Sequence, residues 1–371
     1  MKKYSAPSDA LLRAFLFVLV LFCSGLVLAS EIPDFEKIAR SHEKQTTADR
    51  RWLHENPELS NRETGTQAYL RRALEEIPGI TFIEGDWGTG LVAELRGALP
   101  GPRVAWRADM DALPITEDTD LPFRSTCTDT LSGGRAVGVM HACGHDLHMS
   151  IALGAIRTLA SVRDQMPGTL MIIFQPAEET GDGAYDLLEA GLFDGDRKPK
   201  CIMAFHDHPT IAFGMVGSCS GWSTANVDGF RLTVKGQGGH GAYPHRSIDP
   251  VTLAAKMVLA FNDIVAREID VNHHAVISVG RIEGGSKGNV IPDEVYLEAT
   301  VRTHDDETRQ GVRAKIERTV IGLALSVDAP EPGLDYYFGT PAGYNDPELT
   351  AQARQVFRRV LGDENSITYP P

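Results

Sequence analysis

Apolar strand-like runs alternate with amphipathic helical patterns along the first half of the chain, and this alternation limits the fold more than any other feature. Continuous apolar runs separated by helices are typical of buried strands in an α/β layer, so we expect a largely parallel sheet. The predicted elements are helices 32–59, 64–77, 148–162 and 184–189, and strands 80–83, 90–95, 104–107, 169–174 and 201–205.

The pattern changes near Gly221 to a β-α-β-β-α-β order, which is typical of a ferredoxin-like domain. We therefore expect an α/β protein of two domains. The first part of the α/β domain would span 32–220, the inserted domain 221–338 and the returning part 339–371. The inserted elements are strands 229–235, 275–282, 294–303 and 334–338 and helices 249–269 and 306–325. A helix over 347–361 and the start of a strand at Asn365 follow.

The N-terminus has the layout of a secretory signal peptide. Lys2, Lys3 and Arg13 precede an apolar run that ends at small residues, with cleavage expected after Ala29. A membrane anchor is the alternative, but the run is short for a spanning helix and is interrupted by Cys23-Ser24-Gly25. We therefore expect residues 1–29 to be removed and the protein to be periplasmic or secreted.

Charge and cysteine content exclude two classes of protein. The chain has 36 Lys+Arg against 50 Asp+Glu, whereas a nucleic-acid partner requires clustered cations. Only Cys127, Cys143, Cys201 and Cys219 follow the signal peptide, which is too few for a disulfide scaffold. A disulfide among Cys127, Cys201 and Cys219 stays open.

A dense group of ligand-type side chains lies between His141 and His148, in the run His-Ala-Cys-Gly-His-Asp-Leu-His. Cys143 and His145 are separated by one glycine and can converge on one cation, because thiolate and imidazole are ligands of zinc-like metals. A structural zinc finger would need a second paired set, which the sequence lacks. A cysteine nucleophile at Cys143 is the other alternative.

Carboxylates follow two of the predicted strands. Glu178 and Glu179 come directly after the strand 169–174, and Asp109 and Asp111 follow the strand 104–107. One carboxylate of the Glu178-Glu179 pair can bind a metal while the other acts as general base on water. Open α/β sheets place ligands at such strand ends.

Three further segments carry candidate polar side chains. His206 and His208 end the strand 201–205, and one of them is a plausible further ligand. His240 lies in a glycine-rich turn, where its imidazole could donate a hydrogen bond to a developing oxyanion. Asn289 lies in a Gly-rich hairpin loop that can offer it to a substrate.

Together these runs resemble the amidohydrolase subfamily of the aminoacylase/carboxypeptidase metallopeptidases, which includes hippurate, auxin-conjugate and N-acyl-amino-acid hydrolases. The matching runs fall in order over nearly all of the chain after residue 29, which makes their combination very specific. They are Leu53–Ser60, Arg107–Ile115, His141–Asp146, Gln175–Glu179, Gly239–His245 with Asp249-Pro250, and Asn289–Glu294.

The resemblance implies a role for each matching position. Two divalent ions, commonly Mn, Zn, Co or Ni, would be held by Cys143, His145, Glu179 and His206. Glu178 would be the general base, and Asp109 would support the site from behind the ligands. The resemblance also implies that the inserted domain forms a lid that often dimerises. From that lid, His240, Asn289 and Arg302 would contact the substrate.

The chain departs from this resemblance at its C-terminus. Members of the subfamily continue past a Pro-Pro like Pro370-Pro371 into a segment with a last metal-binding histidine, which this sequence does not contain. We therefore expect the C-terminal part of the catalytic domain to be truncated.

The expected activity is metal-dependent hydrolysis of the amide bond of an N-acyl or conjugated amino acid, or of a short peptide. Two other activities stay open: a dipeptidase or carboxypeptidase on the same scaffold, and a truncated, inactive exported protein that binds amino-acid conjugates. A cysteine hydrolase would keep its activity in chelators and lose it on alkylation.

Overall fold

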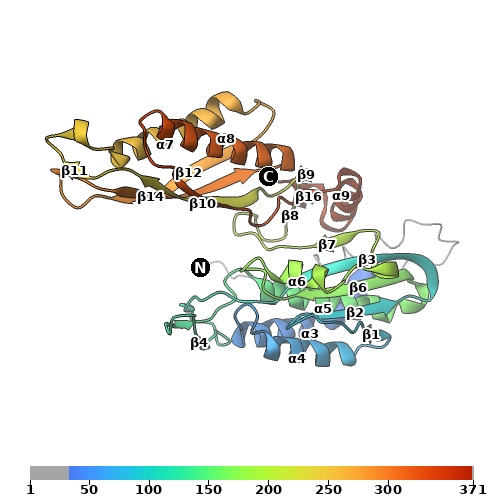
Figure 1. The fold of residues 1–371 in the computed structure, drawn as a ribbon. Coiled ribbons are helices and arrows are strands. Elements are labelled where there is room, and N and C mark those ends of the chain that lie inside the picture. The colour runs from blue at the N-terminus through green and yellow to red at the C-terminus, as the bar shows by residue number, and fades with distance from the viewer. Residues whose placement is uncertain (1–32, 370–371) are drawn as a thin grey trace. The chain divides into compact units, whose positions relative to one another are not determined.

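The computed structural model describes residues 33–369 and divides into two compact units (Figure 1). The first unit contains the described residues up to Ser218 together with Ala351–Thr368, and the second contains Cys219–Thr350. The insertion predicted at 221–338 falls within the second unit. The signal peptide predicted at 1–29 lies outside the described residues. No helix within 33–369 is long and apolar enough to span a membrane.

The first unit is built on a five-stranded sheet with the order β1-β2-β6-β3-β7. Its strands are β1 (Ile80–Phe82), β2 (Leu91–Arg96), β3 (Leu99–Asp109), β6 (Pro167–Gln175) and β7 (Ile202–Ala204). β3 is parallel to both β6 and β7, whereas β2 is antiparallel to both β1 and β6. The sheet is therefore mixed, and the prediction of a largely parallel sheet was wrong.

The short link between β2 and β3 explains the mixed sheet. Only Gly97 and Ala98 separate the two strands, and parallel strands need a crossover of a dozen or more residues. The chain therefore reverses direction, and β6 inserts between the two strands. Gly97 is required at this reversal, because a Cβ atom there would lie 2.0 Å from the Met166 carbonyl oxygen.

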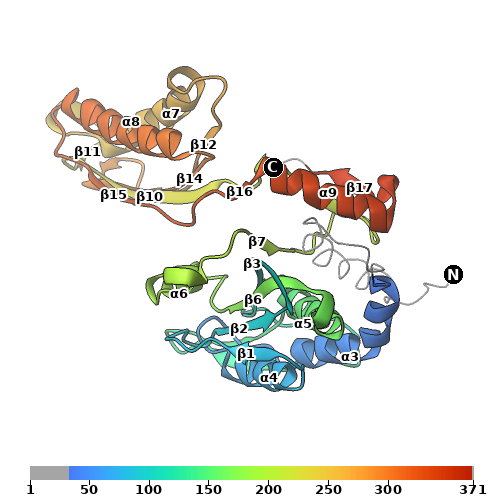
Figure 2. The same ribbon diagram turned by 90° about the vertical axis from the view of Figure 1, so that its right-hand side faces the viewer.

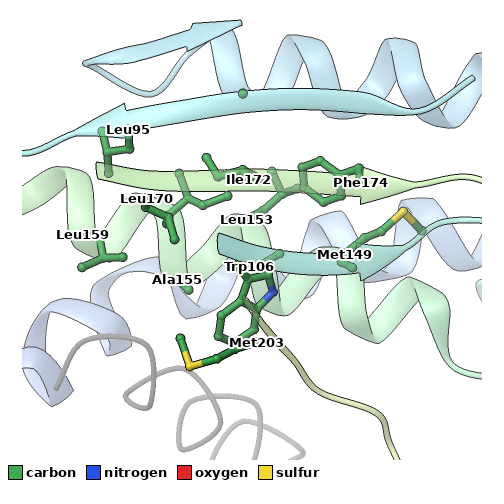
Figure 3. Packing of buried hydrophobic residues seen from close by; sticks show 14 of the residues in the cluster. Leu95, Trp106, Met149, Leu153, Ala155, Leu159, Leu170, Ile172, Phe174 and Met203 are labelled. Carbon is green, nitrogen blue, oxygen red and sulfur yellow. The ribbon is translucent and has the colours of Figure 1, made fainter. Parts of the chain in front are cut away.

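Helices cover both faces of this sheet. The helices are α3 (Phe35–Glu55), α4 (Thr64–Glu75), α5 (His145–Ser161) and α6 (Gly183–Glu189). Leu170, Ile172 and Phe174 of β6 share one core with residues of α3, α4 and α5 (Figure 3). Met171 and Ile173 point to the opposite face and share a second core with Leu187 of α6 and its neighbours. This alternation along one strand makes the unit a three-layer α/β structure.

The segment after the second unit completes the first unit. Val356 and Phe357 of α9 (Pro347–Leu361) are buried in the core that also contains α5. Beyond α9, β17 (Ser366–Thr368) pairs in parallel with β8 (Val216–Ser218), so the strand predicted to start near Asn365 is present. The smaller elements of this unit are β4 (Thr128–Thr130), β5 (Ala136–Gly138), and the 3-10 turns η1 (Arg163–Gln165), η2 (Gly195–Arg197) and η5 (Asp363–Asn365).

The second unit has the β-α-β-β-α-β element order expected from the sequence, with an antiparallel sheet ordered β12-β14-β10-β15. Helices α7 and α8 lie on one face of this sheet (Figure 2). The elements are β10 (Asn226–Lys235), α7 (Pro250–Asp263) continued by the π-helical η4 (Ile264–Glu268), β12 (Ala275–Gly284), β14 (Glu294–Thr303), α8 (Asp306–Leu325) and β15 (Gly333–Tyr337). The smaller elements are β9 (Gly221–Trp222), β11 (Gly239–His240), η3 (Pro244–Arg246), β13 (Val290–Ile291) and β16 (Tyr344–Asn345).

Strict alternation along β14 explains why the helices cover one face. Val295, Leu297, Ala299 and Val301 are buried in the core shared with α7 and α8, while the residues between them are half-buried on the other face. The α7 helix begins at Pro250, because the Asp249 side chain accepts hydrogen bonds from the first free backbone N–H groups.

Candidate metal centre

The carboxyl ends of β3, β6 and β7 meet at one edge of the first sheet, because these three strands are neighbours and mutually parallel. Asp109 ends β3, Glu178 and Glu179 follow β6, and His206 follows β7. The residues predicted from separate strand ends are therefore brought together. A crevice beyond the carboxyl ends of the strands is where open α/β sheets bind ligands.

His145 occupies the centre of this edge as the first residue of α5. The helix begins three residues before the predicted start at His148, because Gly144 adopts a left-handed φ of 78° and turns the chain into the helix. A Cβ atom on Gly144 would lie 2.1 Å from the Asp207 Oδ1 atom, so another residue would be strained at this φ and would have to displace the Asp207 side chain. The sequence offers no sign of a left-handed residue here other than the glycine itself.

The two ring nitrogens of His145 have different surroundings. Nδ1 lies 2.8 Å from the backbone carbonyl oxygen of Asp111 and donates its proton there. In the neutral ring Nε2 is then an acceptor, and among the described residues it has no hydrogen-bond partner although the side chain is fully buried. A backbone carbonyl that accepts the proton of one ring nitrogen and leaves the other nitrogen free is the usual arrangement around a metal-binding histidine.

Carboxylates surround the free Nε2 atom of His145. It lies 3.6 Å from Asp109 Oδ2, 3.8 Å from Glu179 Oε1 and 3.9 Å from Glu178 Oε2. The Glu179 Oε1 atom is also buried without a partner among the described residues. Two buried acceptors that face each other without a donor cost free energy, unless a proton or a metal cation lies between them.

Cys143 and His206 form the second half of the cluster. The Cys143 Sγ atom lies 3.5 Å from His206 Nε2, while His206 Nδ1 lies 2.6 Å from the carbonyl oxygen of Asp207. His206 therefore repeats the arrangement of His145, with Nδ1 held by a backbone carbonyl and Nε2 directed at the cluster. Burial and then the negative charge of Glu179 raise the pKa of the Cys143 thiol to about 12.

These residues fit a divalent metal pair. The candidate ligand atoms of Cys143, His145 and His206 all lie within 4.8 Å of one another, and so do those of His145, Glu178 and Glu179. The two groups share His145, and between them they offer thiolate, imidazole and carboxylate. That mixture suits zinc-like first-row metals better than calcium or magnesium, which prefer oxygen alone.

Glu178 and Glu179 differ in their hydrogen bonds and in their exposure to solvent. The Glu179 backbone N–H donates to Asp111 Oδ2 at 3.0 Å, which also accepts the Ser60 hydroxyl at 2.6 Å. The Glu178 side chain is 38% exposed and the Glu179 side chain 21%, so Glu178 has the better access to solvent. Burial and then the charge of Asp109 raise the pKa of Glu178, which is the direction in which the pKa of a carboxylate general base is usually shifted.

Asp109 lies behind the cluster and stays ionised. Burial opposes its ionisation, but the hydrogen bond from His148 and then the charge of Arg107 outweigh burial and lower its pKa. The Arg107 Nη1 atom lies 2.6 Å from Asp109 Oδ2. Asp109 is therefore an anion next to the cluster, and its supporting role stays a prediction.

His148 is a part of this site to which the sequence analysis gave no role. Its Nδ1 lies 2.5 Å from Asp109 Oδ1 and its Nε2 lies 3.1 Å from Asp207 Oδ1. It thus joins the end of β3 to the segment after β7, and these two carboxylates outweigh its burial and raise its pKa to about 9. The only signal in the sequence was its place in the histidine-rich run that starts at His141.

A buried polar chain beneath α5 was also missed. His54 lies between two carboxylates, 2.9 Å from Asp146 Oδ2 and 3.1 Å from Glu117 Oε1. Arg50 Nε lies 2.8 Å from the same Asp146 oxygen. This chain connects α3 to the residue next to His145. The run Leu53–Ser60 marked the segment, but nothing in it identified the partners of His54.

The predicted substrate-binding residues lie in the second unit. His240 is exposed on β11, where its Nδ1 accepts a hydrogen bond from the Ala242 N–H at 3.1 Å. Asn289 lies next to this turn, since its carbonyl accepts from the Gly241 N–H at 2.9 Å. The second unit therefore holds His240 and Asn289 together.

Arg302 is separate from that pair. It lies near the far end of β14, which starts at Glu294, and strands rise about 3.4 Å per residue. Its Nη1 atom lies 3.0 Å from the Val301 carbonyl oxygen and also contacts the Thr300 hydroxyl. Within one chain's second unit, Arg302 cannot contact the same small carboxylate as Asn289.

Comparison with known proteins identifies the chain's relatives. Residues 105–371, more than half of the chain, match the model of peptidase family M20/M25/M40. The chain belongs to this family. An N-acetyl-L-cysteine deacetylase of Bacillus subtilis (strain 168) is 39% identical over 316 residues, which cover 85% of this chain and 72% of that protein.

Two further relatives agree with this assignment. An N-acetyldiaminopimelate deacetylase of Brevibacillus brevis is 36% identical over 86% of this chain and 81% of its own length. A solved Bacillus subtilis structure, described as a dinuclear metal-binding peptidase of the M20 family, has a TM-score of 0.74 and 33% identity. That match covers 91% of this chain and 83% of the other. The chain is thus an amide-bond hydrolase of the M20 family, and the predicted resemblance and enzyme class are confirmed.

Proposed function

We propose that this protein is a metal-dependent deacylase of small N-acyl amino acids, with N-acetyl amino acids as its first candidates. The observation that carries the proposal is a pair of buried atoms, His145 Nε2 and Glu179 Oε1, which have no hydrogen-bond partner among the described residues and lie 3.8 Å apart. Glu178 Oε2 lies 3.9 Å from the same His145 nitrogen. The two named relatives act on N-acetylated amino acids, which supports this substrate class.

Cys143, His145, Glu179 and His206 would hold the metal pair. A pair of divalent ions, when bound, supplies Lewis acidity that activates water and polarises an amide carbonyl. Manganese, zinc, cobalt and nickel all suit this donor set, and the ligands do not choose between them. The buried Asp109 and Asp111 add negative charge behind the ligands and keep the cluster attractive to cations.

Glu178 would carry the proton. In the proposed reaction its carboxylate accepts a proton from the attacking water while the new C–O bond forms at the amide carbon. It then gives that proton to the amine nitrogen as the C–N bond breaks, so the products are a carboxylic acid and a free amino acid.

The geometry disfavours the alternative of a cysteine nucleophile. A reactive cysteine needs a lowered pKa, whereas burial and the neighbouring glutamates raise the pKa of Cys143 even though His206 lies 3.5 Å from its sulfur. A bound divalent cation would favour the thiolate form that binds metal. Activity of the proposed kind is therefore lost in chelators and returns with metal.

We place the substrate-facing lid and the dimer contact in the second unit, as proposals. His240 would contact the substrate carbonyl, and Asn289 would lie near the carboxylate end. β12 is an edge strand with half-exposed Val276 and Ile282, at 50% and 54%. An unpaired edge with apolar side chains can pair with a second copy, so sedimentation should give a dimer that charged substitutions on β12 dissociate.

Export to the periplasm or the medium is also a proposal, and it rests on the residues before Ser30. N-terminal sequencing of the mature protein after expression with its own leader tests it. Cleavage after Ala29 is the expected result. A mature protein that still begins at Met1 and stays in the cytoplasm would contradict it.

Acetate release from a panel of N-acetyl-L-amino acids, with dipeptides alongside, tests the proposed function. The protein is stripped with a chelator and reloaded separately with manganese, zinc, cobalt and nickel. We expect turnover only after reloading, and on N-acyl amino acids rather than dipeptides. Faster turnover of dipeptides would favour a peptidase. Stoichiometric metal and ligand binding with no hydrolysis of any substrate would favour a binding protein instead.

A further inference from the structure

The turn that leads from β6 to Glu178 contains a strained residue. Ala177 has a φ of 49°, in the left-handed region that is unfavourable for an L-residue, and its side chain is fully buried. Such conformations persist only where the surroundings enforce them, and they cluster at functional sites. The residue immediately after the turn is the proposed general base.

Close packing encloses this turn on two sides. A Cβ atom on Gly90 would lie 2.8 Å from Pro176 Cδ, and one on Gly183 would lie 1.8 Å from the Pro176 carbonyl oxygen. Both positions therefore need glycine so that the backbone can approach the turn. Packing limits where Pro176 and Ala177 can lie, but it leaves the Ala177 N–H in need of a buried acceptor.

Glu63 supplies that acceptor. Its Oε1 atom accepts the Ala177 N–H at 2.8 Å, and its Oε2 atom accepts the Thr89 hydroxyl at 2.6 Å. Glu63 is fully buried, at 0% exposure. It lies 114 residues from Ala177 in the sequence, so only the fold brings the two together.

A role limited to holding α4 does not explain this carboxylate. Glu63 precedes α4, yet its side chain makes no hydrogen bond to the helix. The backbone N–H groups of Gly65 and Thr66, at the start of α4, donate to the Glu58 carboxylate instead. Burying a carboxylate is costly without hydrogen bonds, so a residue that only filled space here would be apolar.

We propose that Glu63 is a positioning residue for the general base, acting through the backbone of Ala177. Its carboxylate fixes the Ala177 amide in the left-handed conformation, and this sets the direction in which Glu178 leaves the strand. Asp111 does the same one step later, because it accepts the N–H of Glu179. The turn is thus held at both sides of Glu178. The inference rests on the proposed function only in assigning Glu178 as the base.

Three substitutions at Glu63 separate the effect of side-chain length on kcat from the effect of side-chain charge. E63Q keeps the length and an oxygen for the Ala177 N–H, and its amide can donate to Thr89, so we expect kcat within about fivefold of wild type. E63D keeps the charge but is one methylene too short, and E63M removes the acceptor. For both we expect kcat to fall about 10- to 100-fold at nearly unchanged KM, the usual effect of misplacing a catalytic group by about 1 Å.

Two measurements keep this effect apart from general damage. Metal content should stay at the wild-type value in E63D and E63M. Hydrogen exchange of the peptide around Ala177 should accelerate in both, while peptides of α4 stay protected. E58Q is the matched control, since it weakens a nearby carboxylate that accepts the α4 N–H groups. It should lower the melting temperature and leave kcat alone.

A double-mutant cycle tests the route through the turn. Glycine adopts the left-handed region at little cost, so A177G should reduce the loss of kcat caused by E63D. The proposal would be overturned if E63D lowered kcat equally in the wild-type and A177G backgrounds. A wild-type kcat in E63D, or a strongly reduced kcat in E63Q, would overturn it as well. If E63M does not fold, the E63D and E63Q pair still decides. Full activity in E178Q would instead refute the proposed function. The hydrogen-exchange test of whether Glu63 holds the Ala177 amide would still be valid.

Discussion

At the scale of single residues, the site depends on histidines whose two ring nitrogens have different partners. His145 and His206 each direct Nδ1 to a backbone carbonyl and Nε2 to the cluster. His148 instead lies between two carboxylates and has no free nitrogen. The first two are therefore suited to bind metal, and the third to hold the groups behind them.

Replacing His148 tests this division. H148F removes the hydrogen bonds to Asp109 and Asp207 without touching a proposed ligand. Loss of such a supporting partner typically weakens metal affinity by about 10- to 100-fold. Competition titration with a chromophoric chelator measures it. H42F, a histidine outside the cluster whose Nε2 lies 3.3 Å from Ser161 Oγ, is the control and should leave the affinity unchanged.

His54 should make the stability of the metal-free protein depend on pH. Burial disfavours its imidazolium, but the hydrogen bond to Asp146 and the charge of that carboxylate outweigh burial and raise the pKa of His54 above 6.5. A raised pKa means that the stabilisation is complete below the unfolded value of 6.5 and is lost as pH rises through the folded value.

The comparison of wild type with H54Q measures this contribution. In urea titrations with chelator present, H54Q should be less stable by roughly 1.5–3 kcal/mol near pH 6, the range of a hydrogen bond to a charged group. The difference should shrink toward pH 9. A difference that grows with pH would show that His54 is neutral in the folded protein.

At the scale of secondary-structure elements, the start of α5 is the feature that positions His145. Gly144 is left-handed and in close contact with Asp207, so G144A adds both strain and a clash. We expect a loss of more than about 1–2 kcal/mol of stability, the cost of a left-handed L-residue alone, and weaker metal binding.

Gly133 provides the matched control for that substitution. It has a φ of 102°, but a Cβ atom there would meet nothing within 4 Å. G133A should therefore show the conformational cost without the clash and with unchanged metal affinity. Thermal unfolding and metal titration of the two variants separate these effects. Equal metal affinity in G144A and G133A would contradict the role given to the α5 start.

The elements also show what the sequence can and cannot reveal. Most helices and strands were predicted from the sequence, because the spacing of apolar residues depends directly on secondary structure. For example, α8 and β14 have the predicted bounds. Sheet direction was not predicted, because it depends on the short Gly97-Ala98 link rather than on periodicity. Ligand types were visible in the run His141–His148, but the partners of His148 and Glu63 were not. Those partners come from distant segments that only the folded chain brings close.

At the scale of the whole molecule, the two units have separate hydrophobic cores. The candidate ligands belong to the first unit, and the second contains none of them. A ligand that binds only folded protein stabilises the unit that binds it, by about 2.7 kcal/mol at a hundred times its Kd. Metal should therefore act on one unit more than on the other.

Calorimetry of the full chain with metal and with chelator checks this expectation. We expect the chelator to lower the melting temperature of the transition assigned to the first unit. The melting temperature of the second unit should stay unchanged. Hydrogen exchange assigns the transitions, because core peptides of β6 report on the unfolding of the first unit and core peptides of β14 on that of the second. An equal shift of both transitions would mean that the units unfold together.

The most direct test of the central claim is E178Q, studied for metal content and for turnover in the same preparation. Glutamine keeps the shape of Glu178 and leaves Cys143, His145, Glu179 and His206 in place. It cannot accept the proton of the attacking water. We expect metal at the wild-type stoichiometry by elemental analysis, together with loss of acetate release from N-acetyl amino acids of at least about 100-fold. Turnover equal to wild type with metal bound would contradict the account.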